Sequence, residues 1–242
     1  MNRYFLEISY KGTNYAGFQI QQNAVTVQEE VEKALAVLFR QKITLTGSSR
    51  TDTGVHALQN YFHFDIDQKI SEGVIYNLNA LLPPDIAANS LRAVDSQAHC
   101  RFDAVSRKYR YRIYNRKNPF LQGLAYYYPY TLDILLMEEA ARMIMRYADF
   151  TAFAKRNSQV KTHNCIILES RWVQEKEYLS YEVKANRFLR GMVRGLTGTM
   201  LQVGRGKLSI REFISIIEER DASKTDFSVP AHGLCLEEVL FG

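Results

Sequence analysis

A short polar stretch combines an arginine and an aspartate with turn-forming residues. Residues 47–57 read Gly-Ser-Ser-Arg-Thr-Asp-Thr-Gly-Val-His-Ala, with Arg50 two residues before Asp52 and a glycine on either side. This layout can present a carboxylate on a tight turn with a cation beside it. A nearby opposite charge favours the ionised form of a carboxyl group, so Arg50 would hold Asp52 ionised. An ionised, positioned carboxylate can act as nucleophile, base or cation stabiliser.

The same stretch is also ordinary turn chemistry. Asp52 precedes Thr53 and Gly54, and in such turns Asp bonds its own backbone while Gly supplies a positive φ. Carboxylates are perturbed in structural ion pairs as well as in active sites. From this stretch alone, a structural turn and a functional site are equally good interpretations.

Residues 107–113 predict a strand with one aromatic side. Tyr109 and Tyr111 share that side, because side chains alternate along a strand. The other side is basic and consists of Lys108, Arg110 and Arg112. The pattern alone favours a half-buried strand with a solvated basic face. The functional interpretation is an aromatic ring in a cleft beside a phosphate-attracting surface, the combination that holds single RNA bases.

A helix predicted over residues 187–202 would place three arginines on one stripe, at Arg187, Arg190 and Arg194. An ordinary surface stripe explains Arg187 and Arg190. Arg194 follows Val193 at the edge of the apolar face, where we expect it to be partly buried. A partly buried arginine needs a carboxylate partner.

The pattern of cysteines and glycines does not indicate metal or nucleotide chemistry. Cys100, Cys165 and Cys235 are far apart, odd in number and form no C-x-x-C pair, so we expect neither a disulfide framework nor a zinc site. The run at 204–207, Gly-Arg-Gly-Lys, lacks the phosphate-loop spacing because Leu201 occupies the place of the first glycine. We expect no metal and no cofactor.

The composition is that of an ordinary globular protein. The chain has 242 residues, of which 46% are hydrophobic and 24% charged, enough for one large domain or two small ones. No apolar run approaches the ~18 residues of a membrane span, and the first residues lack the apolar core of a signal peptide. We expect a cytoplasmic protein without a membrane partner. The net charge of +5 is a weak indication of a polyanionic partner.

Hydrophobic patterns along the chain predict an α+β protein. The expected strands are 4–10, 42–45, 61–66, 107–114 and a hairpin of 168–173 with 178–184. The expected helices are 26–40, 71–82, 132–147, 187–202 and 209–219, with capping boxes at Thr26/Glu29 and Ser209/Glu212. We therefore predict two similar mixed α/β halves with antiparallel sheets, residues 1–100 and 101–242. They would pack together with an active-site cleft between them.

The stretch at 47–57 resembles the active-site signature of the tRNA pseudouridine synthases of the TruA family, G-x-G-R-T-D-x-G-V-H-A. Further segments resemble the family's motifs in the family's order, namely 10–19, 78–86, 99–111, 149–153, 185–207 and 230–236. The departures are Lys11 for Asp, Phe18 for Trp, Ser49 for Gly, and Ala98, Cys100 and Asp103. Together the matches run from residue 8 to about residue 240, and this ordered set is specific.

The resemblance implies roles for five side chains. Asp52 would be the catalyst, either by attacking C1′ of uridine or by removing a ribose proton. Tyr109 would contact the target uracil, and Leu234 would pack against it, although a core leucine would look the same. Arg194 would pair with Asp52 across the cleft, and Arg50 would fill the space that the flipped base leaves.

The resemblance also implies the substrate and the assembly. The target would lie in the anticodon stem-loop of tRNA, at the thirty-eighth, thirty-ninth and fortieth nucleotides, and the enzyme would be a homodimer. Lys108, Arg110, Arg112, Arg187 and Arg190 are the residues we expect to hold RNA phosphates. Two other classes of protein are alternatives to this one, a non-catalytic tRNA-binding RNA chaperone and a nucleic-acid hydrolase. A hydrolase would assemble several carboxylates around a metal. The stretch at 47–57 has one carboxylate, that of Asp52, which argues against a hydrolase.

Overall fold

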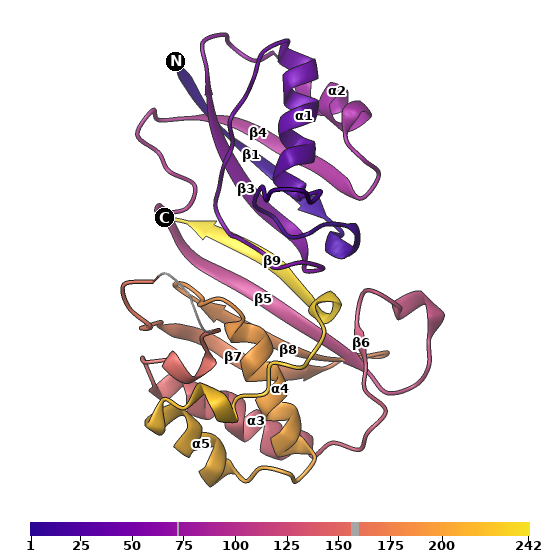
Figure 1. Cartoon of the computed structure of the whole chain (residues 1–242), viewed down its shortest axis with the longest axis vertical. Helices are drawn as coiled ribbons and strands as arrows, with labels where there is room; N and C mark the ends of the chain where they lie inside the picture. The colour runs from indigo at the N-terminus through magenta and orange to yellow at the C-terminus, as the bar shows by residue number, and fades with distance from the viewer. Residues whose placement is uncertain (72, 156–159) are drawn as a thin grey trace. The chain divides into compact units, whose positions relative to one another are not determined.

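The computed structural model describes residues 1–71, 73–155 and 160–242. Within them the chain forms two compact units (Figure 1). Unit 1 comprises Met1–Val105 and Cys235–Gly242, and unit 2 comprises Ser106–Leu234. Each unit combines strands with helices, which confirms the predicted α+β class. In the described ranges, no helix has both the length and the hydropathy to cross a membrane.

The sheet of unit 1 is built around β3 (His56–Ile66). Strand β1 (Asn2–Tyr10) pairs antiparallel with β3 and, on its other edge, with β4 (Ile86–Val94). The two-residue strand β2 (Thr46–Gly47) adds to β3 antiparallel. Strand β9 (Leu234–Phe241) joins β3 in parallel, with Cys235 opposite His56. The last residues of the sequence thus complete the sheet of the first unit.

Two helices pack beside each other in unit 1, α1 (Val27–Phe39) and α2 (Val74–Leu81) (Figure 1). Helix α1 begins after Thr26, whose hydroxyl accepts a hydrogen bond from the Glu29 N–H at 3.3 Å. The Glu29 carboxylate forms an ion pair with Lys33 at 2.8 Å. The N-cap that the sequence predicts is therefore present. The Glu29 carboxylate, which a capping box would use, pairs with Lys33 one turn further along α1.

Unit 2 has a sheet of β5 (Ala104–Tyr114), β8 (Leu179–Ala185) and β7 (Ile167–Gln174), paired antiparallel in that order. The short strand β6 (Tyr126–Tyr127) runs parallel to β5. Helices α3 (Ile134–Met143), α4 (Met192–Gly204) and α5 (Ile210–Glu219) form a layer beside the sheet (Figure 1). The Ser209/Glu212 capping box of α5 is formed as predicted.

The strand predicted at 42–45 is wrong. Ile43 and Leu45 are both buried, which produces the alternating pattern, but side chains of α1 satisfy the backbone. The Leu45 N–H donates to the Glu32 carboxylate and the Leu45 carbonyl accepts from the Gln28 amide, each at 2.9 Å. Strand pairing therefore begins only at Thr46.

The helix predicted from residue 187 begins later, at Met192. Gly191 has a φ of 75°, in the left-handed region, so a continuous helix cannot pass through it. Arg187 and Arg190 lie in the loop before α4, and the predicted stripe of three arginines is wrong. The sequence patterns also do not predict β4, β6 and β9, and two pairings, β3 with β9 and β5 with β6, are parallel.

Candidate active site

The turn that carries Asp52 connects β2 to β3. The Val55 N–H donates to the Asp52 carbonyl at 3.1 Å, and Gly54 has a φ of 79°, as a turn with a left-handed third residue requires. The turn that the sequence predicts is therefore present. Arg50 is exposed and Asp52 is half-buried, so the carboxylate lies at the edge of the core.

Buried hydrogen bonds anchor the chain just before Asp52. The Thr51 hydroxyl is 2.8 Å from the Tyr10 hydroxyl. The amide of Asn60, which is fully buried, donates to the Tyr10 hydroxyl at 3.2 Å and to the Ser49 carbonyl at 2.9 Å. Side chains from β1 and β3 thus hold the residues on both sides of Arg50, Ser49 by its carbonyl and Thr51 by its hydroxyl. Such anchoring limits how far the adjacent carboxylate can move, as a preorganised site requires.

Close approach of two segments further fixes the turn. The Phe18 N–H donates to the Thr51 carbonyl at 3.1 Å, and the Phe18 ring stacks on Phe62 with 4.6 Å between ring centroids. A Cβ on Gly47 would lie 2.1 Å from that ring, so only glycine fits there. Ser49 has no positive φ, so the backbone at this position does not require the glycine of the family signature.

Tyr109 lies on β5 in unit 2, where it is buried. It is opposite Val183 of β8, and its ring meets that of Phe188 edge to face at 5.1 Å. Phe188 belongs to the loop before α4. Tyr109 is therefore held between its neighbouring strand and this loop.

The basic side of β5 surrounds a buried acid. Glu182 of β8, whose side chain is 5% exposed, forms ion pairs with Lys108 at 3.0 Å and Arg110 at 2.7 Å, and with Arg171 of β7 at 2.8 Å. Burial alone would raise the pKa of Glu182, but its hydrogen bonds to Arg171 and Lys108 outweigh burial and hold it below its usual value. The Arg112 guanidinium lies over the Tyr178 ring, 5.5 Å from its centroid. Lys108, Arg110 and Arg112 are half-buried, so the basic face that the pattern predicts is only partly exposed to solvent.

Arg194 lies in the first turn of α4 and is half-buried, as expected. Its guanidinium donates to the Val229 carbonyl through Nε at 2.9 Å and through Nη2 at 2.6 Å. Nη2 also lies 3.4 Å from the Phe227 carbonyl. Within unit 2 its partners are therefore backbone carbonyls of the segment that leads to Leu234. Leu234 itself is buried at the start of β9.

Sequence reasoning missed Tyr10 and Asn60 as supports of the turn. The signal for Asn60 was a polar residue directly before the apolar strand residues Tyr61 and Phe62. Such a residue is buried only when it is hydrogen-bonded. Nothing in the local pattern of Tyr10 indicates its bond to Thr51, because the two residues are far apart in the sequence.

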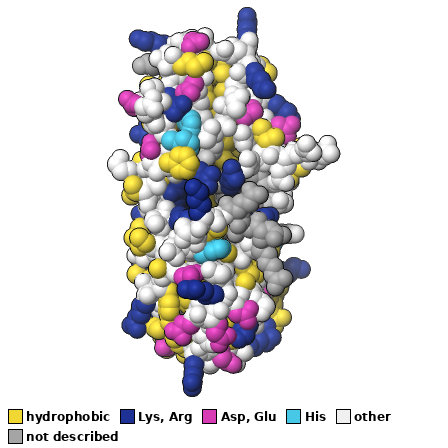
Figure 2. Space-filling model, turned by 60° about the vertical axis from the view of Figure 1, so that its left-hand side comes forward, with side chains coloured by type: hydrophobic (Ala, Val, Ile, Leu, Met, Phe, Trp, Pro, Cys, Tyr) yellow, Lys and Arg dark blue, Asp and Glu magenta, His cyan; other side chains and the backbone are white. Residues whose placement is uncertain are grey.

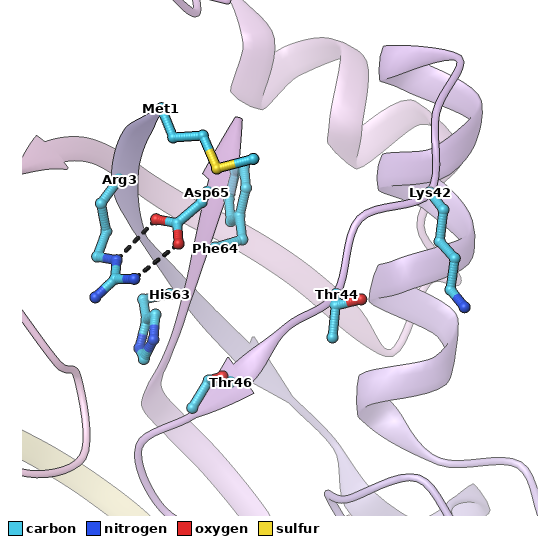
Figure 3. A pocket seen from close by; sticks show the side chains of 8 residues that line it. All are labelled: Met1, Arg3, Lys42, Thr44, Thr46, His63, Phe64 and Asp65. Carbon is cyan, nitrogen blue, oxygen red and sulfur yellow. Dashed lines mark hydrogen bonds and ion pairs between the residues drawn. The ribbon is translucent and has the colours of Figure 1, made fainter. Parts of the chain in front are cut away.

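A cavity of about 360 Å³ lies elsewhere in unit 1 (Figure 3). Its lining consists of Met1, Arg3, Lys42, Thr44, Thr46, His63, Phe64 and Asp65. Arg3 donates two hydrogen bonds to Asp65, at 2.8 and 2.7 Å, and a third to the Ala98 carbonyl. Each nitrogen of the guanidinium thus already donates one hydrogen bond, and this cavity contains none of the predicted site residues.

Charged side chains of both signs cover the helical layer of unit 2. At the lower end of the view in Figure 2, Lys and Arg side chains lie interspersed with Asp and Glu. In this unit Arg142 forms an ion pair with Glu138, and Lys224 forms one with Glu219. Over residues 1–71, 73–155 and 160–242, no group of three or more His, Cys, Asp and Glu side chains is arranged to hold a metal ion.

The fold and the site thus define an α+β protein with an aspartate on a hydrogen-bonded turn of unit 1 and a tyrosine on strand β5 of unit 2. The family model described as tRNA pseudouridine synthase matches residues 8–103 and 140–242. The chain belongs to the tRNA pseudouridine synthase family.

Curated relatives from several bacteria are similar over nearly the whole chain. A protein of Parabacteroides distasonis is 44% identical over 243 residues, which cover 100% of this chain and 96% of the relative. One of Porphyromonas gingivalis is 43% identical, covering 100% of this chain and 98% of the relative. One of Staphylococcus aureus is 38% identical, covering 98% and 90%. Each of the three is named tRNA pseudouridine synthase A.

Proposed function

We propose that this protein isomerises uridine to pseudouridine in tRNA. The N1–C1′ bond of the nucleoside breaks, the uracil turns over, and C5 bonds to C1′, so the reaction is redox-neutral. Membership of the family and the full-length similarity to proteins named tRNA pseudouridine synthase A support this activity. The structural observation that carries it is the buried hydrogen-bonded support of the turn at Asp52.

Asp52 is the proposed catalyst. A carboxylate on a fixed turn can attack C1′ to form a covalent intermediate or remove a ribose proton to give a glycal-like intermediate. Both routes need the carboxylate in its ionised form and in one position. The bonds from Tyr10 to Thr51 and from Asn60 to Ser49 support the second requirement, a fixed position.

The remaining site residues are proposed to receive the flipped base. A base inside an RNA stem must first leave its stack, at a cost of a few kcal/mol. Arg50, which is exposed, would occupy the vacated space, while Tyr109 and Leu234 would contact the uracil. Tyr109 could also accept the C5 proton. Arg194 would orient Asp52, in addition to its bonds to the Val229 carbonyl.

The family resemblance extends the proposal to the substrate site and the assembly. The target is the anticodon stem-loop, at the thirty-eighth to fortieth nucleotides, and the enzyme acts as a homodimer in the cytoplasm. We also propose that residues 1–100 and 101–242 are two halves that share the active site, since Asp52 belongs to the first and Tyr109 and Arg194 to the second.

Five basic residues are proposed to hold RNA phosphates, namely Lys108, Arg110, Arg112, Arg187 and Arg190. Arg187 and Arg190 belong to the same loop as Phe188, whose ring meets that of Tyr109. Lys108 and Arg110 would have to share their charge between Glu182 and a phosphate.

The test is Asp52→Asn, compared with wild type and with Asp67→Asn as a matched control on the exposed surface of unit 1. Each protein is incubated with unmodified tRNA in EDTA, and pseudouridine is mapped after a single turnover. We expect Asp52→Asn to lose at least about a thousand-fold in rate while its affinity for tRNA and its fold are retained. Asp67→Asn should match wild type.

Other outcomes would contradict the proposal. Near-normal product formation by Asp52→Asn would remove Asp52 as catalyst. Wild-type protein that binds tRNA but forms no pseudouridine would favour the RNA chaperone. RNA cleavage in a parallel incubation with Mg²⁺ that is abolished by EDTA would indicate a metal-dependent hydrolase.

A further inference from the structure

The segment at residues 225–234, here called the strap, is fixed along one side of α4. A Cβ on Gly198 would lie 2.2 Å from the Asp226 carbonyl oxygen, so the strap backbone touches the helix directly. The Asp226 N–H donates to the Thr199 hydroxyl at 3.1 Å, and its carboxylate accepts from the Gln202 amide at 2.6 Å. The first half of the strap therefore cannot shift without breaking these contacts.

The second half of the strap rests on one tyrosine of β5. The hydroxyl of Tyr111 donates to the Pro230 carbonyl at 2.7 Å. A Cβ on Gly233 would lie 2.6 Å from the Tyr111 ring, so the glycine packs flat on that ring. Tyr111 is fully buried, and burial raises its pKa, so the hydroxyl keeps its proton and acts as the donor. Leu234 follows Gly233 directly.

We propose that Tyr111 is a positioning residue that places Leu234 for contact with the target base. Its hydroxyl fixes Pro230 and its ring supports Gly233, which together determine where the Leu234 side chain begins. Strand β5 would then have two roles at the base. Tyr109 would contact the base directly, and Tyr111 would position Leu234 through the strap. This inference rests on the proposed function, because it presumes that Leu234 contacts the uracil.

The test compares Tyr111→Phe with Tyr181→Phe. Tyr181 lies directly opposite Tyr111 in the register of β5 and β8. It is equally buried, and its hydroxyl bonds to Ser170 at 3.0 Å, away from the strap. Both variants lose one buried hydroxyl and keep the ring. We expect Tyr111→Phe to lower kcat roughly tenfold with little change in KM for tRNA, and Tyr181→Phe to change kcat less than about twofold.

A double-mutant cycle with Leu234→Ala gives a result that a merely structural role would not produce. If Tyr111 acts through Leu234, Tyr111→Phe should cost almost nothing further in kcat in the Leu234→Ala background. Independent losses that multiply would overturn the inference. Should Tyr111→Phe fail to fold, Gly233→Ala is the second variant. Its new Cβ would push the strap off the ring, and it should show the same loss of kcat and the same dependence on Leu234.

The inference and the proposed function fail in different ways. Wild-type protein that forms no pseudouridine overturns both. Active wild-type protein with Tyr111→Phe equal to Tyr181→Phe overturns only the positioning role. A Leu234→Ala variant with full activity overturns the positioning role and the proposed contact of Leu234 with the base, but leaves pseudouridine formation by the wild type in place. Melting temperatures of all variants, measured in parallel, separate loss of activity from loss of fold.

Discussion

His63 of β3 is a buried histidine that the proposed reaction does not use. Its Nδ1 lies 3.2 Å from the Cys100 sulfur and 3.3 Å from the Cys100 backbone nitrogen. The ring of His99 meets it edge to face at 4.6 Å. Burial, and then the charges of His99 and Arg3, lower the pKa of His63 to about 4 from 6.5. His63 is therefore neutral in the folded protein at neutral pH, and its imidazole helps to hold the turn at Cys100.

The low pKa of His63 makes stability depend on pH. Between pH 6.5 and about 4 the unfolded chain binds a proton at His63 that the folded chain does not, so the free energy of unfolding falls as the pH is lowered through this window. His63→Asn can keep an acceptor near the position of Nδ1 but does not titrate. We expect urea unfolding of this variant to show a weaker pH dependence between about pH 7 and pH 4.5 than wild type. Equal slopes would mean that His63 does not control this behaviour.

At the scale of single residues, local sequence chemistry predicted the turn but not its supports. Asp-Thr-Gly indicates a tight turn because Gly54 can adopt the positive φ that it has here. The bonds of Tyr10 to Thr51 and of Asn60 to Ser49 join residues that are separated in the sequence. The residues next to each partner therefore do not predict these bonds. The catalytic role of Asp52 stays a prediction that rests on the family resemblance.

Among the elements, α4 shows how a glycine can serve packing rather than flexibility. An Ala in place of Gly inside a helix normally stabilises by roughly 0.5–1 kcal/mol. At Gly198 the added Cβ would lie 2.2 Å from the backbone oxygen of Asp226, which cannot rotate away. We expect Gly198→Ala to destabilise unit 2 by about 1–3 kcal/mol, measured as the free energy of urea unfolding.

Gly204 at the end of the same helix is the matched control. Its added Cβ would lie 2.4 Å from the sulfur and 2.7 Å from Cγ of Met137, an unbranched side chain that adjusts to a new neighbour more readily than backbone does. Gly204→Ala should therefore cost clearly less than Gly198→Ala. Equal stability of Gly198→Ala and wild type would contradict the close contact between α4 and the strap.

Element boundaries were predictable where a side chain marks them. Ser209 and Glu212 begin α5 as a capping box, and Thr26 begins α1. The start of α4 is marked only by the backbone of Gly191, while apolar spacing continues into the preceding loop, so the pattern predicts a helix that is too long. At 42–45, burial of alternate residues imitated a strand although side chains of α1 bind the Leu45 backbone.

For the molecule as a whole, the excess of positive charge should govern tRNA binding. The net charge is +5, and each phosphate contact that a cation makes releases counterions. We expect the association constant for tRNA to fall steeply with salt. Arg187→Gln with Arg190→Gln should reduce the slope of log K against log salt by about 1.5, since each contact contributes roughly 0.7–0.9.

The control for charge alone is Arg142→Gln with Arg146→Gln. These two arginines are exposed on α3 and just after it, and their loss changes the net charge by the same amount. We expect this pair to leave the slope nearly unchanged in filter-binding titrations. Equal slopes in the two double variants would show that the loop before α4 makes no specific phosphate contact.

The α+β class followed from the sequence because amphipathic helices and strands carry local patterns. The arrangement of β9 did not, because its partner in β3 lies far away in the chain and the parallel pairing covers only His56 and Ala57. Contacts such as the bond of the Val239 N–H to Gln59 at 2.9 Å complete the attachment. Long-range pairings of this kind have no signature in a single segment.

The position of β9 also sets an order of events during synthesis on the ribosome. Domains generally fold as they emerge, but unit 1 must wait for its final strand until residues 106–234 have been made. In a nascent chain the edge of β3 at His56 and Ala57 is therefore exposed, and exposed strand edges invite pairing with other chains. The stretch that bears Asp52 directly precedes that edge, so this turn borders a strand edge that stays exposed until the end of synthesis.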